Sequence, residues 1–144
     1  MHGFSDGSLS GYGCCIYLKA TSEDGKAQVT FVTAKSRVIP SNKKMTVPRA
    51  ELMGNFILVK LLISVKQAIG ALIHIRDIIC WTDSMVSLYW IKSRSKDLKV
   101  FEQNRVNFIT ENTSSEKWFH CKSEENPADV VSKWGFYSKV HKRF

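Results

Sequence analysis

The stretch Ile75-Arg76-Asp77-Ile78-Ile79-Cys80-Trp81-Thr82-Asp83-Ser84 lies near the middle of the chain and joins two elements of different kinds. Its first part, residues 75–81, is a mostly apolar run of strand length, which is typical of a strand at the centre of a sheet. Its end predicts a helix that runs to about Lys92, with Asp83 or Ser84 as the N-cap. An acidic residue therefore stands where a buried strand gives way to a helix.

Three strands and a long helix are predicted before this stretch. We expect the strands at residues 2–6, 11–20 and 28–36. The pair Asp24-Gly25 predicts a hairpin turn between the second strand and the third. A basic loop then leads into the helix, whose apolar residues repeat at helical spacing until Gly70. Pro48 suits the first turn of this helix, and Thr46 or Val47 is expected at its cap.

Two more helices and one more strand are predicted after the stretch. We expect a helix at residues 98–111, a strand at 117–121 and a last helix that opens at Asn126-Pro127. This order of elements indicates an α/β fold in which helices flank a mixed sheet. We expect a single domain over residues 1–144, with a core at about 2–135 and a basic, aromatic tail at 136–144.

Composition and charge limit the classes of function. The chain has 144 residues, of which 44% are hydrophobic and 24% are charged, and this is typical of one globular domain. The net charge of +8 favours a polyanionic partner such as nucleic acid, although the same charge also serves solubility alone. The longest apolar stretch is interrupted by Lys60, so we expect no membrane span.

The cysteines indicate an intracellular protein. All four fall in predicted strands: Cys14, Cys15, Cys80 and Cys121. Because they form no Cys-x-x-Cys pair, we expect no zinc site. Buried, reduced thiols are typical of the cytoplasm or the nucleus. Cys14 and Cys15 are adjacent, so we expect them on opposite faces of their strand.

Four acidic residues, each in a short motif of its own, are the candidate catalytic and metal-binding residues. They are Asp6 in Phe4-Ser5-Asp6-Gly7-Ser8, Glu51 in Pro48-Arg49-Ala50-Glu51-Leu52, Asp83 in Trp81-Thr82-Asp83-Ser84, and Asp129 in Asn126-Pro127-Ala128-Asp129. Carboxylates that converge repel one another unless they hold cations, and hard oxygen ligands select Mg²⁺ or Mn²⁺. Two such ions are the usual apparatus for cutting a phosphodiester.

Each of the four acids also has a purely structural interpretation. Asp6 precedes a glycine and suits a turn, while Glu51 in a first helical turn favours the helix dipole. Asp83 suits a helix cap, and Asp129 suits a capping box with Asn126. We expect the remaining acids, Glu102 among them, to be solvated.

Basic and hydroxyl side chains near these motifs are the candidate substrate-binding residues. The basic ones are Arg37, Lys43, Lys44, Arg49, Lys92 and Arg94, each of which can take a phosphate. Ser8 and Ser84 can donate hydrogen bonds to a phosphate or to a metal-bound water. A solvated face is the alternative interpretation for every one of the basic residues. We expect Trp81 and Trp90 to pack in the core.

The chain resembles the ribonuclease H-like domain of retroelement polyproteins, in particular the BEL/Pao retrotransposon type. The matching stretches are His2-Gly3-Phe4-Ser5-Asp6, Ala34-Lys35-Ser36-Arg37-Val38, Thr46-Val47-Pro48-Arg49-Ala50-Glu51-Leu52, Trp81-Thr82-Asp83-Ser84, Tyr89-Trp90-Ile91 and Glu125-Asn126-Pro127-Ala128-Asp129. Each is weak alone, but six in order over residues 2–135 are a strong signal.

The resemblance implies a fold, an activity and a set of partners. It implies a ribonuclease H-like fold, with a five-stranded mixed sheet of order 3-2-1-4-5 in which the fourth strand lies parallel beside the first. It also implies a metal-dependent endonuclease that cuts the RNA strand of RNA/DNA hybrids during retroelement reverse transcription. Asp6, Glu51, Asp83 and Asp129 would hold two Mg²⁺ or Mn²⁺ ions. The parent polyprotein would also contain reverse transcriptase and integrase regions.

One departure from related enzymes leaves alternatives open. Many of them carry a mobile histidine on the loop before the last aspartate, but residues 122–128 contain none, and His120 lies in a predicted strand. Because retroelement copies decay, a catalytically silent nucleic-acid-binding or scaffolding domain of a decayed copy is also an alternative, against which stands the survival of all four acids. An integrase or transposase core is a further alternative, but its acids run Asp, Asp, Glu.

Overall fold

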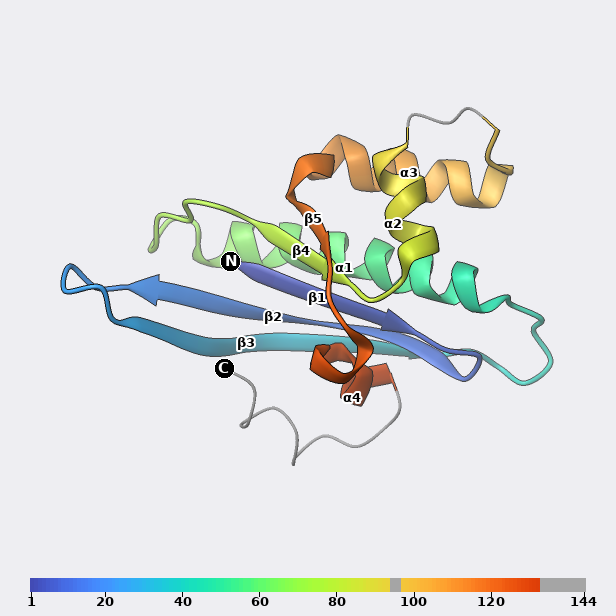
Figure 1. Cartoon of the computed structure of the whole chain (residues 1–144), viewed down its shortest axis with the longest axis horizontal. Coiled ribbons are helices and arrows are strands. Elements are labelled where there is room, and N and C mark those ends of the chain that lie inside the picture. The colour runs from blue at the N-terminus through green and yellow to red at the C-terminus, as the bar shows by residue number, and fades with distance from the viewer. Residues whose placement is uncertain (94–96, 133–144) are drawn as a thin grey trace.

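The computed structural model describes residues 1–93 and 97–132, which form a five-stranded sheet with helices on both faces (Figure 1). The strands are β1 (His2–Gly7), β2 (Gly11–Thr21), β3 (Ala27–Val38), β4 (Ile79–Thr82) and β5 (Trp118–His120). The helices are α1 (Val47–Ile69), α2 (Met85–Lys92), α3 (Val100–Asn112) and α4 (Ala128–Ser132), with short 3-10 turns η1 (Ser115–Lys117) and η2 (Ser123–Glu125). The tail that we predicted at 136–144 lies outside the described residues.

The strand order is β3-β2-β1-β4-β5, as the resemblance implied. Strand β2 pairs antiparallel with both β1 and β3, whereas β4 pairs parallel with both β1 and β5. The parallel pairs require crossovers, and helices supply them, since α1 precedes β4 and both α2 and α3 lie between β4 and β5. The result is the predicted mixed sheet.

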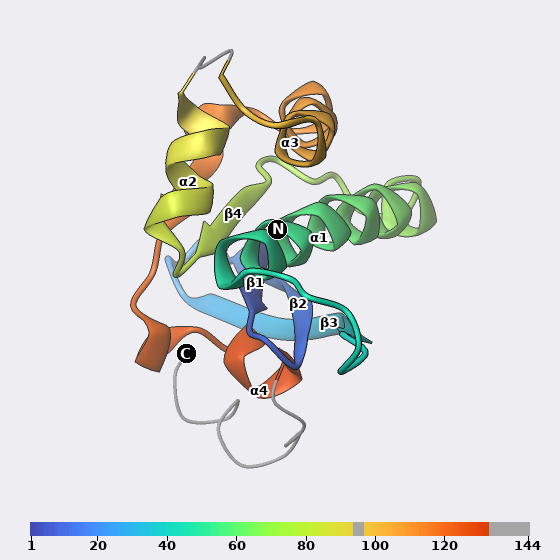
Figure 2. The same ribbon diagram turned by 90° about the vertical axis from the view of Figure 1, so that its right-hand side faces the viewer.

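Two hydrophobic layers hold the helices against the sheet. Figure 2 shows α1, α2 and α3 on one face and α4 on the other. Cys14 belongs to the larger layer on the α1 face, together with the fully buried Trp118. Cys15 belongs to the smaller layer, which includes Val131 of α4. The two adjacent cysteines therefore face opposite sides of β2, as predicted.

The helix caps agree with the sequence and remove two ambiguities. Thr46, rather than Val47, caps α1, because its Oγ1 accepts a hydrogen bond from Arg49 N at 3.4 Å. Ser84, rather than Asp83, caps α2, because its Oγ accepts from Ser87 N at 3.1 Å. Asp83 is therefore not required to cap the helix that follows it.

One prediction about the centre of the sheet was wrong. Strand β4 begins at Ile79 rather than at Ile75, because its parallel neighbour β1 begins at His2, which pairs with Ile79. Residues 75–78 therefore lie before the start of β1 and have no residue of β1 to pair with. Trp81 and Trp90, which we expected to pack in the core, are both half-buried and pack against the smaller and the larger layer, respectively.

Helix α1 is long and apolar enough, by length and composition alone, to cross a membrane. The core helix of a globular domain has the same properties, and α1 has that position in the described structure. Leu52, Leu58 and Val59 are fully buried in the layer between α1 and the sheet. Its apolar face is thus used for packing within this domain.

Candidate functional site

Four acidic side chains from four separate segments of the chain line one cavity of ≈ 520 Å³. Asp6 lies in β1, Glu51 near the start of α1, Asp83 directly after β4 and Asp129 in α4. The structure therefore brings together all the acids that we predicted as metal ligands, although they are far apart in the sequence.

Strand pairing places Asp6 beside Asp83. In the parallel pair of β1 and β4, Ser5 is the partner of Thr82. The residue that follows each partner is an aspartate, so both carboxylates emerge at the same edge of the sheet.

Two glycines allow α1 to approach β1 closely enough for Glu51 to reach these aspartates. A Cβ atom on Gly7 would lie 2.4 Å from backbone atoms of Ala50 and Glu51. A Cβ atom on Gly54 would lie 2.6 Å from Asp6 O. A side chain at either position would therefore push the start of α1, and Glu51 with it, away from β1.

Asp6 is the most buried of the four acids, with 6% of its surface exposed. Its Oδ2 accepts a hydrogen bond from Ser132 Oγ at 2.5 Å. Burial raises the pKa of Asp6 to about 6, and the charges of Asp83 and Asp129 add to the rise, while the hydrogen bond from Ser132 opposes it. Asp6 therefore holds a proton in mildly acidic solution when no cation is bound.

Glu51 is held by the residue that follows Asp83. Ser84 Oγ donates a hydrogen bond to Glu51 Oε2 at 2.5 Å. Burial raises the pKa of Glu51, and the charge of Asp83 raises it further, against the effect of that hydrogen bond. The negative charge of Asp83 therefore disfavours the ionised form of Glu51.

Asp83 has an oxygen that the described residues leave without a partner. Its Oδ1 is buried and accepts no hydrogen bond from any residue in the described ranges. A buried carboxylate oxygen without a partner is costly. A cation in the adjoining cavity would supply the missing interaction.

Asp129 is positioned by a residue that we had predicted only as a helix cap. Asn126 Oδ1 accepts a hydrogen bond from Ala128 N at 3.0 Å, which confirms the cap. Asn126 Nδ2 also donates to Ser5 O at 2.9 Å, so the same side chain ties the start of α4 to β1 beside Asp6. The Asn-Pro pair predicted the first role, but no sequence signal indicated the second.

The carboxylate oxygens that line the cavity are of the type that a hard cation prefers, but they are not yet close enough together to coordinate one. Within residues 1–93 and 97–132, no three His, Cys, Asp or Glu side chains already stand close enough together to hold a metal ion. Like-charged carboxylates separate when nothing neutralises them, and Asp6 and Glu51 each accept a serine hydrogen bond instead. All the donors are oxygen atoms, which Mg²⁺ and Mn²⁺ prefer.

The two serines predicted to bind substrate lie at the site in different ways. Ser8 lines the cavity, and its hydroxyl is within hydrogen-bonding distance of Ser10 Oγ at 3.0 Å. Ser84 is 3% exposed, and its hydroxyl binds Glu51 and accepts from Ser87 N. Ser84 therefore supports a carboxylate in this structure rather than facing solvent.

Arg49 forms an ion pair that the sequence did not indicate. Its Nε lies 2.7 Å from Glu102 Oε1, and its guanidinium lies 4.7 Å from the centroid of the Phe101 ring. The prediction that Glu102 is solvated was wrong, because 7% of this residue is exposed. As a phosphate ligand, Arg49 would have to exchange Glu102 for the substrate.

The other predicted cations are at the surface. Arg37, Lys43 and Lys44 are exposed on β3 and on the loop that precedes α1. Lys92 is exposed at the end of α2, with its Nζ 5.6 Å from the centroid of the Phe119 ring. Arg94 lies outside the described residues. These lysines are available to a polyanion, and no ion pair is recorded for them within the described ranges.

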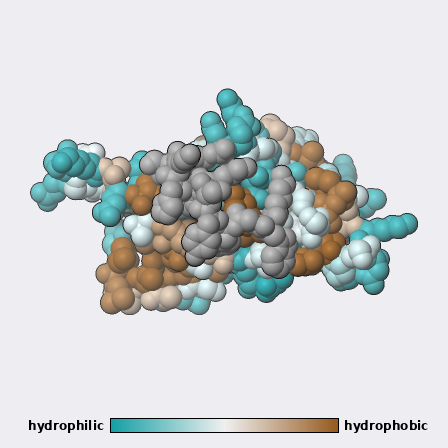
Figure 3. Space-filling model, turned by 90° about the horizontal axis from the view of Figure 1, so that it is seen from below, coloured by the Kyte–Doolittle hydropathy of each residue, from teal (hydrophilic) through white to brown (hydrophobic). Residues whose placement is uncertain are grey.

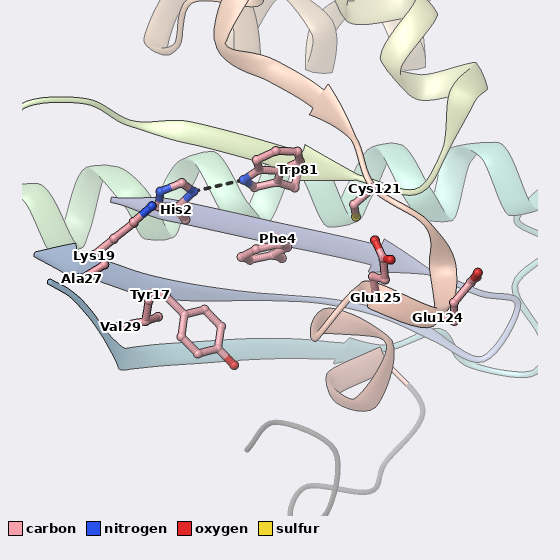
Figure 4. A pocket seen from close by; sticks show the side chains of 10 residues that line it. All are labelled: His2, Phe4, Tyr17, Lys19, Ala27, Val29, Trp81, Cys121, Glu124 and Glu125. Atoms are coloured by element: carbon pink, nitrogen blue, oxygen red, sulfur yellow. Dashed lines mark hydrogen bonds between the residues drawn. The ribbon is translucent and has the colours of Figure 1, made fainter. Parts of the chain in front are cut away.

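A larger cavity of ≈ 720 Å³ lies on the α4 face of the sheet, over Phe4 and Trp81 (Figure 4). Trp81 Nε1 donates a hydrogen bond to His2 Nδ1 at 3.2 Å, and burial lowers the pKa of His2. Figure 3 shows apolar surface on this side of the molecule. The cavity lacks the group of four acids, so it is separate from the candidate metal site.

Comparison with known proteins gives one family and one fold. Residues 1–84, more than half of the chain, match the model of the Pao retrotransposon-like RNaseH-like domain. No curated protein matches the chain. RNase H1 from the halophilic archaeon Halobacterium salinarum NRC-1 is similar in structure, with 16% identity, a TM-score of 0.62 and coverage of 92% of this chain and 93% of that chain.

Two further solved structures have the same fold. The N-terminal RNase H domain of rv2228c from Mycobacterium tuberculosis has 14% identity and a TM-score of 0.64, covering 92% of this chain and 89% of that chain. LC11-RNase H1, solved in complex with an RNA/DNA hybrid, has 15% identity and a TM-score of 0.61, covering 92% and 93%. At such low identity these likenesses establish the fold alone.

Proposed function

Because the chain belongs to the family of Pao retrotransposon-like RNase H-like domains, we propose that it is a metal-dependent endonuclease that cuts the RNA strand of RNA/DNA hybrids during retroelement reverse transcription. One observation carries this proposal: four acids from separate segments of the chain line one cavity, namely Asp6, Glu51, Asp83 and Asp129. A structural role for each acid separately does not explain why all four meet. Ser84, not Asp83, caps α2, which removes one of those separate roles.

The four carboxylates would hold two Mg²⁺ or Mn²⁺ ions. Such ions, when bound, activate a water for attack on a phosphodiester and stabilise the leaving oxygen. The protein's part is to keep its carboxylates ionised and aimed at the cavity. Since burial raises the pKa of Asp6 to about 6, that residue has to lose its proton before it can bind a cation, and this favours neutral or alkaline solution.

Substrate binding would rest on the exposed cations around the cavity. Lys43 and Lys44 lie on the loop directly before α1, which carries Glu51, and Lys92 ends the helix that follows Asp83. Each can bind a phosphate without reading sequence. An RNA/DNA hybrid is the proposed ligand, and reverse transcriptase and integrase regions of a parent polyprotein are the proposed neighbours. The four free thiols support an intracellular location.

One assay tests the proposal. The purified chain is incubated with an RNA/DNA hybrid labelled on both strands, and with duplex DNA, in the presence of Mg²⁺, Mn²⁺ or EDTA. We expect cuts in the RNA strand only, and only with a divalent ion. Cleavage of duplex DNA at the same rate, or cleavage that survives EDTA, would contradict the proposal. Tight binding of the hybrid without cleavage under any condition would instead support a catalytically silent domain.

A further inference from the structure

A chain of buried hydrogen bonds lies beneath the carboxylates, between β1, α1 and α2. Its members are Ser5, Asn55, Ser84 and Ser87, and none of them is more than 3% exposed. Asn55 is at the centre: Ser5 Oγ donates to its Oδ1, and its Nδ2 donates to Ser87 Oγ at 2.9 Å. Both ends of the carboxamide are therefore satisfied inside the core.

This series of hydrogen bonds returns to α1 through Glu51, one of the candidate metal ligands. Ser87 N donates to Ser84 Oγ at 3.1 Å, and Ser84 Oγ donates to Glu51 Oε2 at 2.5 Å. Glu51 stands one helical turn before Asn55 on α1. A ring of contacts thus runs from α1 through α2 and back to α1, and Glu51 is the member that faces the cavity.

Every branch of this ring ends beside an acid of the candidate site. Ser5 precedes Asp6 in β1, and Ser84 follows Asp83. A buried amide that served stability alone needs only partners, and nothing requires those partners to adjoin Asp6, Glu51 and Asp83. An apolar residue on this face of α1 would be the simpler way to fill the core.

We propose that Asn55 is a positioning residue of the metal site, an inference that rests on the proposed function. Asn55 fixes Ser87, Ser87 fixes the Ser84 hydroxyl, and Ser84 aims Glu51 into the cavity. Glutamate has three rotatable side-chain bonds, so a support that limits its rotamers makes it a better ligand. Asparagine suits the position because it donates and accepts at once, whereas aspartate lacks the donor for Ser87.

The test compares Asn55→Ala with Val106→Ala in the purified full chain. Val106 is buried in the same hydrophobic layer, at 5% exposure, but it cannot take part in the ring. Both variants remove buried atoms and are expected to lower the melting temperature. Isothermal titration of the metal-free proteins with Mg²⁺ should show about ten- to hundredfold weaker binding for Asn55→Ala and little change for Val106→Ala.

Kinetics with the hybrid give a second measurement. Asn55 is fully buried, whereas Lys43 and Lys44 are exposed. Asn55→Ala should therefore lower kcat at a fixed Mg²⁺ concentration and leave the KM for the hybrid nearly unchanged. Excess Mg²⁺ should recover part of the lost kcat, because the defect is in ion binding. Val106→Ala, measured in parallel, is the control for the recovery that Mg²⁺ would give any destabilised variant by stabilising the fold.

A milder variant decides the matter if Asn55→Ala does not fold. Ser87→Ala removes one hydroxyl and should weaken Mg²⁺ binding in the same direction. In a folded background, the double variant Asn55→Ala/Ser87→Ala should bind Mg²⁺ no more weakly than Asn55→Ala alone, because both changes break one ring. Mg²⁺ binding that is unchanged in Asn55→Ala and in Ser87→Ala, or lost equally in Val106→Ala, would overturn the inference.

The wild type separates this inference from the proposed function. A wild-type chain that binds Mg²⁺ but cuts no hybrid would defeat the proposed nuclease, while the titrations would still decide the role of Asn55. A wild-type chain that binds no divalent ion would overturn both.

Discussion

Ser132 Oγ donates a hydrogen bond to Asp6 Oδ2 at 2.5 Å, across 126 positions of sequence, and so joins the end of α4 to β1. The same short helix carries Asp129, and Asn126 ties its start to Ser5 O. Two hydrogen bonds therefore fix α4 on either side of Asp129. The one from Ser132 also favours the ionised form of Asp6, which burial disfavours.

The first prediction concerns the pH dependence of stability without metal. The folded pKa of Asp6 is raised to about 6 from an ordinary value of 3.8, so the folded state binds the proton more tightly. The contribution of Asp6 to the free energy of unfolding is thus most favourable below pH 3.8 and falls as pH rises to about 6, by about 3 kcal/mol at most. Asp6→Asn should remove this fall.

Urea unfolding of the two proteins at a series of pH values between 4 and 8, in EDTA, is the measurement. We expect Asp6→Asn to gain stability relative to wild type as pH rises. Ser132→Ala removes the hydrogen bond that favours the ionised form of Asp6. In this variant the free energy of unfolding should fall by more than in the wild type, and the fall should extend to higher pH. A constant difference between Asp6→Asn and wild type at every pH would contradict the raised pKa.

The second prediction concerns the ion pair between α1 and α3. Burial alone would raise the pKa of Glu102, but the hydrogen bond and charge of Arg49 outweigh it and hold that pKa below its ordinary value. The ion pair therefore adds stability above pH 4.5, which is lost as pH falls through the folded pKa. Glu102→Gln should cost about 1–3 kcal/mol of unfolding free energy at pH 7 and much less at pH 3.

Glu102→Gln also tests the predicted role of Arg49 in substrate binding. If Arg49 can exchange Glu102 for a phosphate, the released arginine should bind the hybrid more tightly at low salt, and Arg49→Ala should bind it more weakly. Equal hybrid affinity in wild type, Glu102→Gln and Arg49→Ala would restrict Arg49 to its structural role.

Sequence patterns predicted most of the frame of this site. Thr46, Ser84 and Asn126 were readable as helix caps because each is a short polar residue placed just before a helix. The order of elements predicted a mixed sheet, and the family resemblance implied its strand order, which the structure confirms. The start of β4 could not be predicted from the sequence, because it depends on where the neighbouring strand β1 begins. No local sequence pattern contains that information.

Buried polar groups were the main omission. Glu102 looked solvated because an acid in a helix usually is, and only the pairing of α3 with α1 brings Arg49 to it. Asn55 did leave a signal, since it is a polar residue between Leu52 and Val59 on the apolar face of α1. Such a residue in a buried stripe indicates a hydrogen-bond network, but its partners on β1 and α2 follow only from the tertiary structure.

The third prediction concerns the basic loop before α1. Lys43 and Lys44 are exposed, so their replacement should not alter folding. If both contact phosphates, Lys43→Ala/Lys44→Ala should make the plot of log affinity against log salt less steep by about 1 to 2, without creating a sequence preference. Lys26→Ala, in the hairpin at the opposite end of the sheet (Figure 1), is the control and should leave the slope unchanged.

The last prediction concerns Asp83, whose buried Oδ1 accepts no hydrogen bond within the described part of the chain. Asp83→Asn should abolish cleavage of the hybrid while the fold persists, because Ser84 still caps α2. Without metal, the variant should be as stable as wild type or more so. Two unit charges ~4 Å apart at an effective dielectric of ~20 repel by about 4 kcal/mol, and solvent and protonation reduce that figure.

Metal separates this role from a purely structural one. Saturating Mg²⁺ should raise the melting temperature of the wild type by mass action and raise that of Asp83→Asn much less. The exposed Asp24→Asn variant, in the distant hairpin, is the control and should respond to Mg²⁺ as the wild type does. An Asp83→Asn protein that still cuts the hybrid and gains the full Mg²⁺ stabilisation would remove Asp83 from the metal site. The buried oxygen at the end of β4 would then need a different partner.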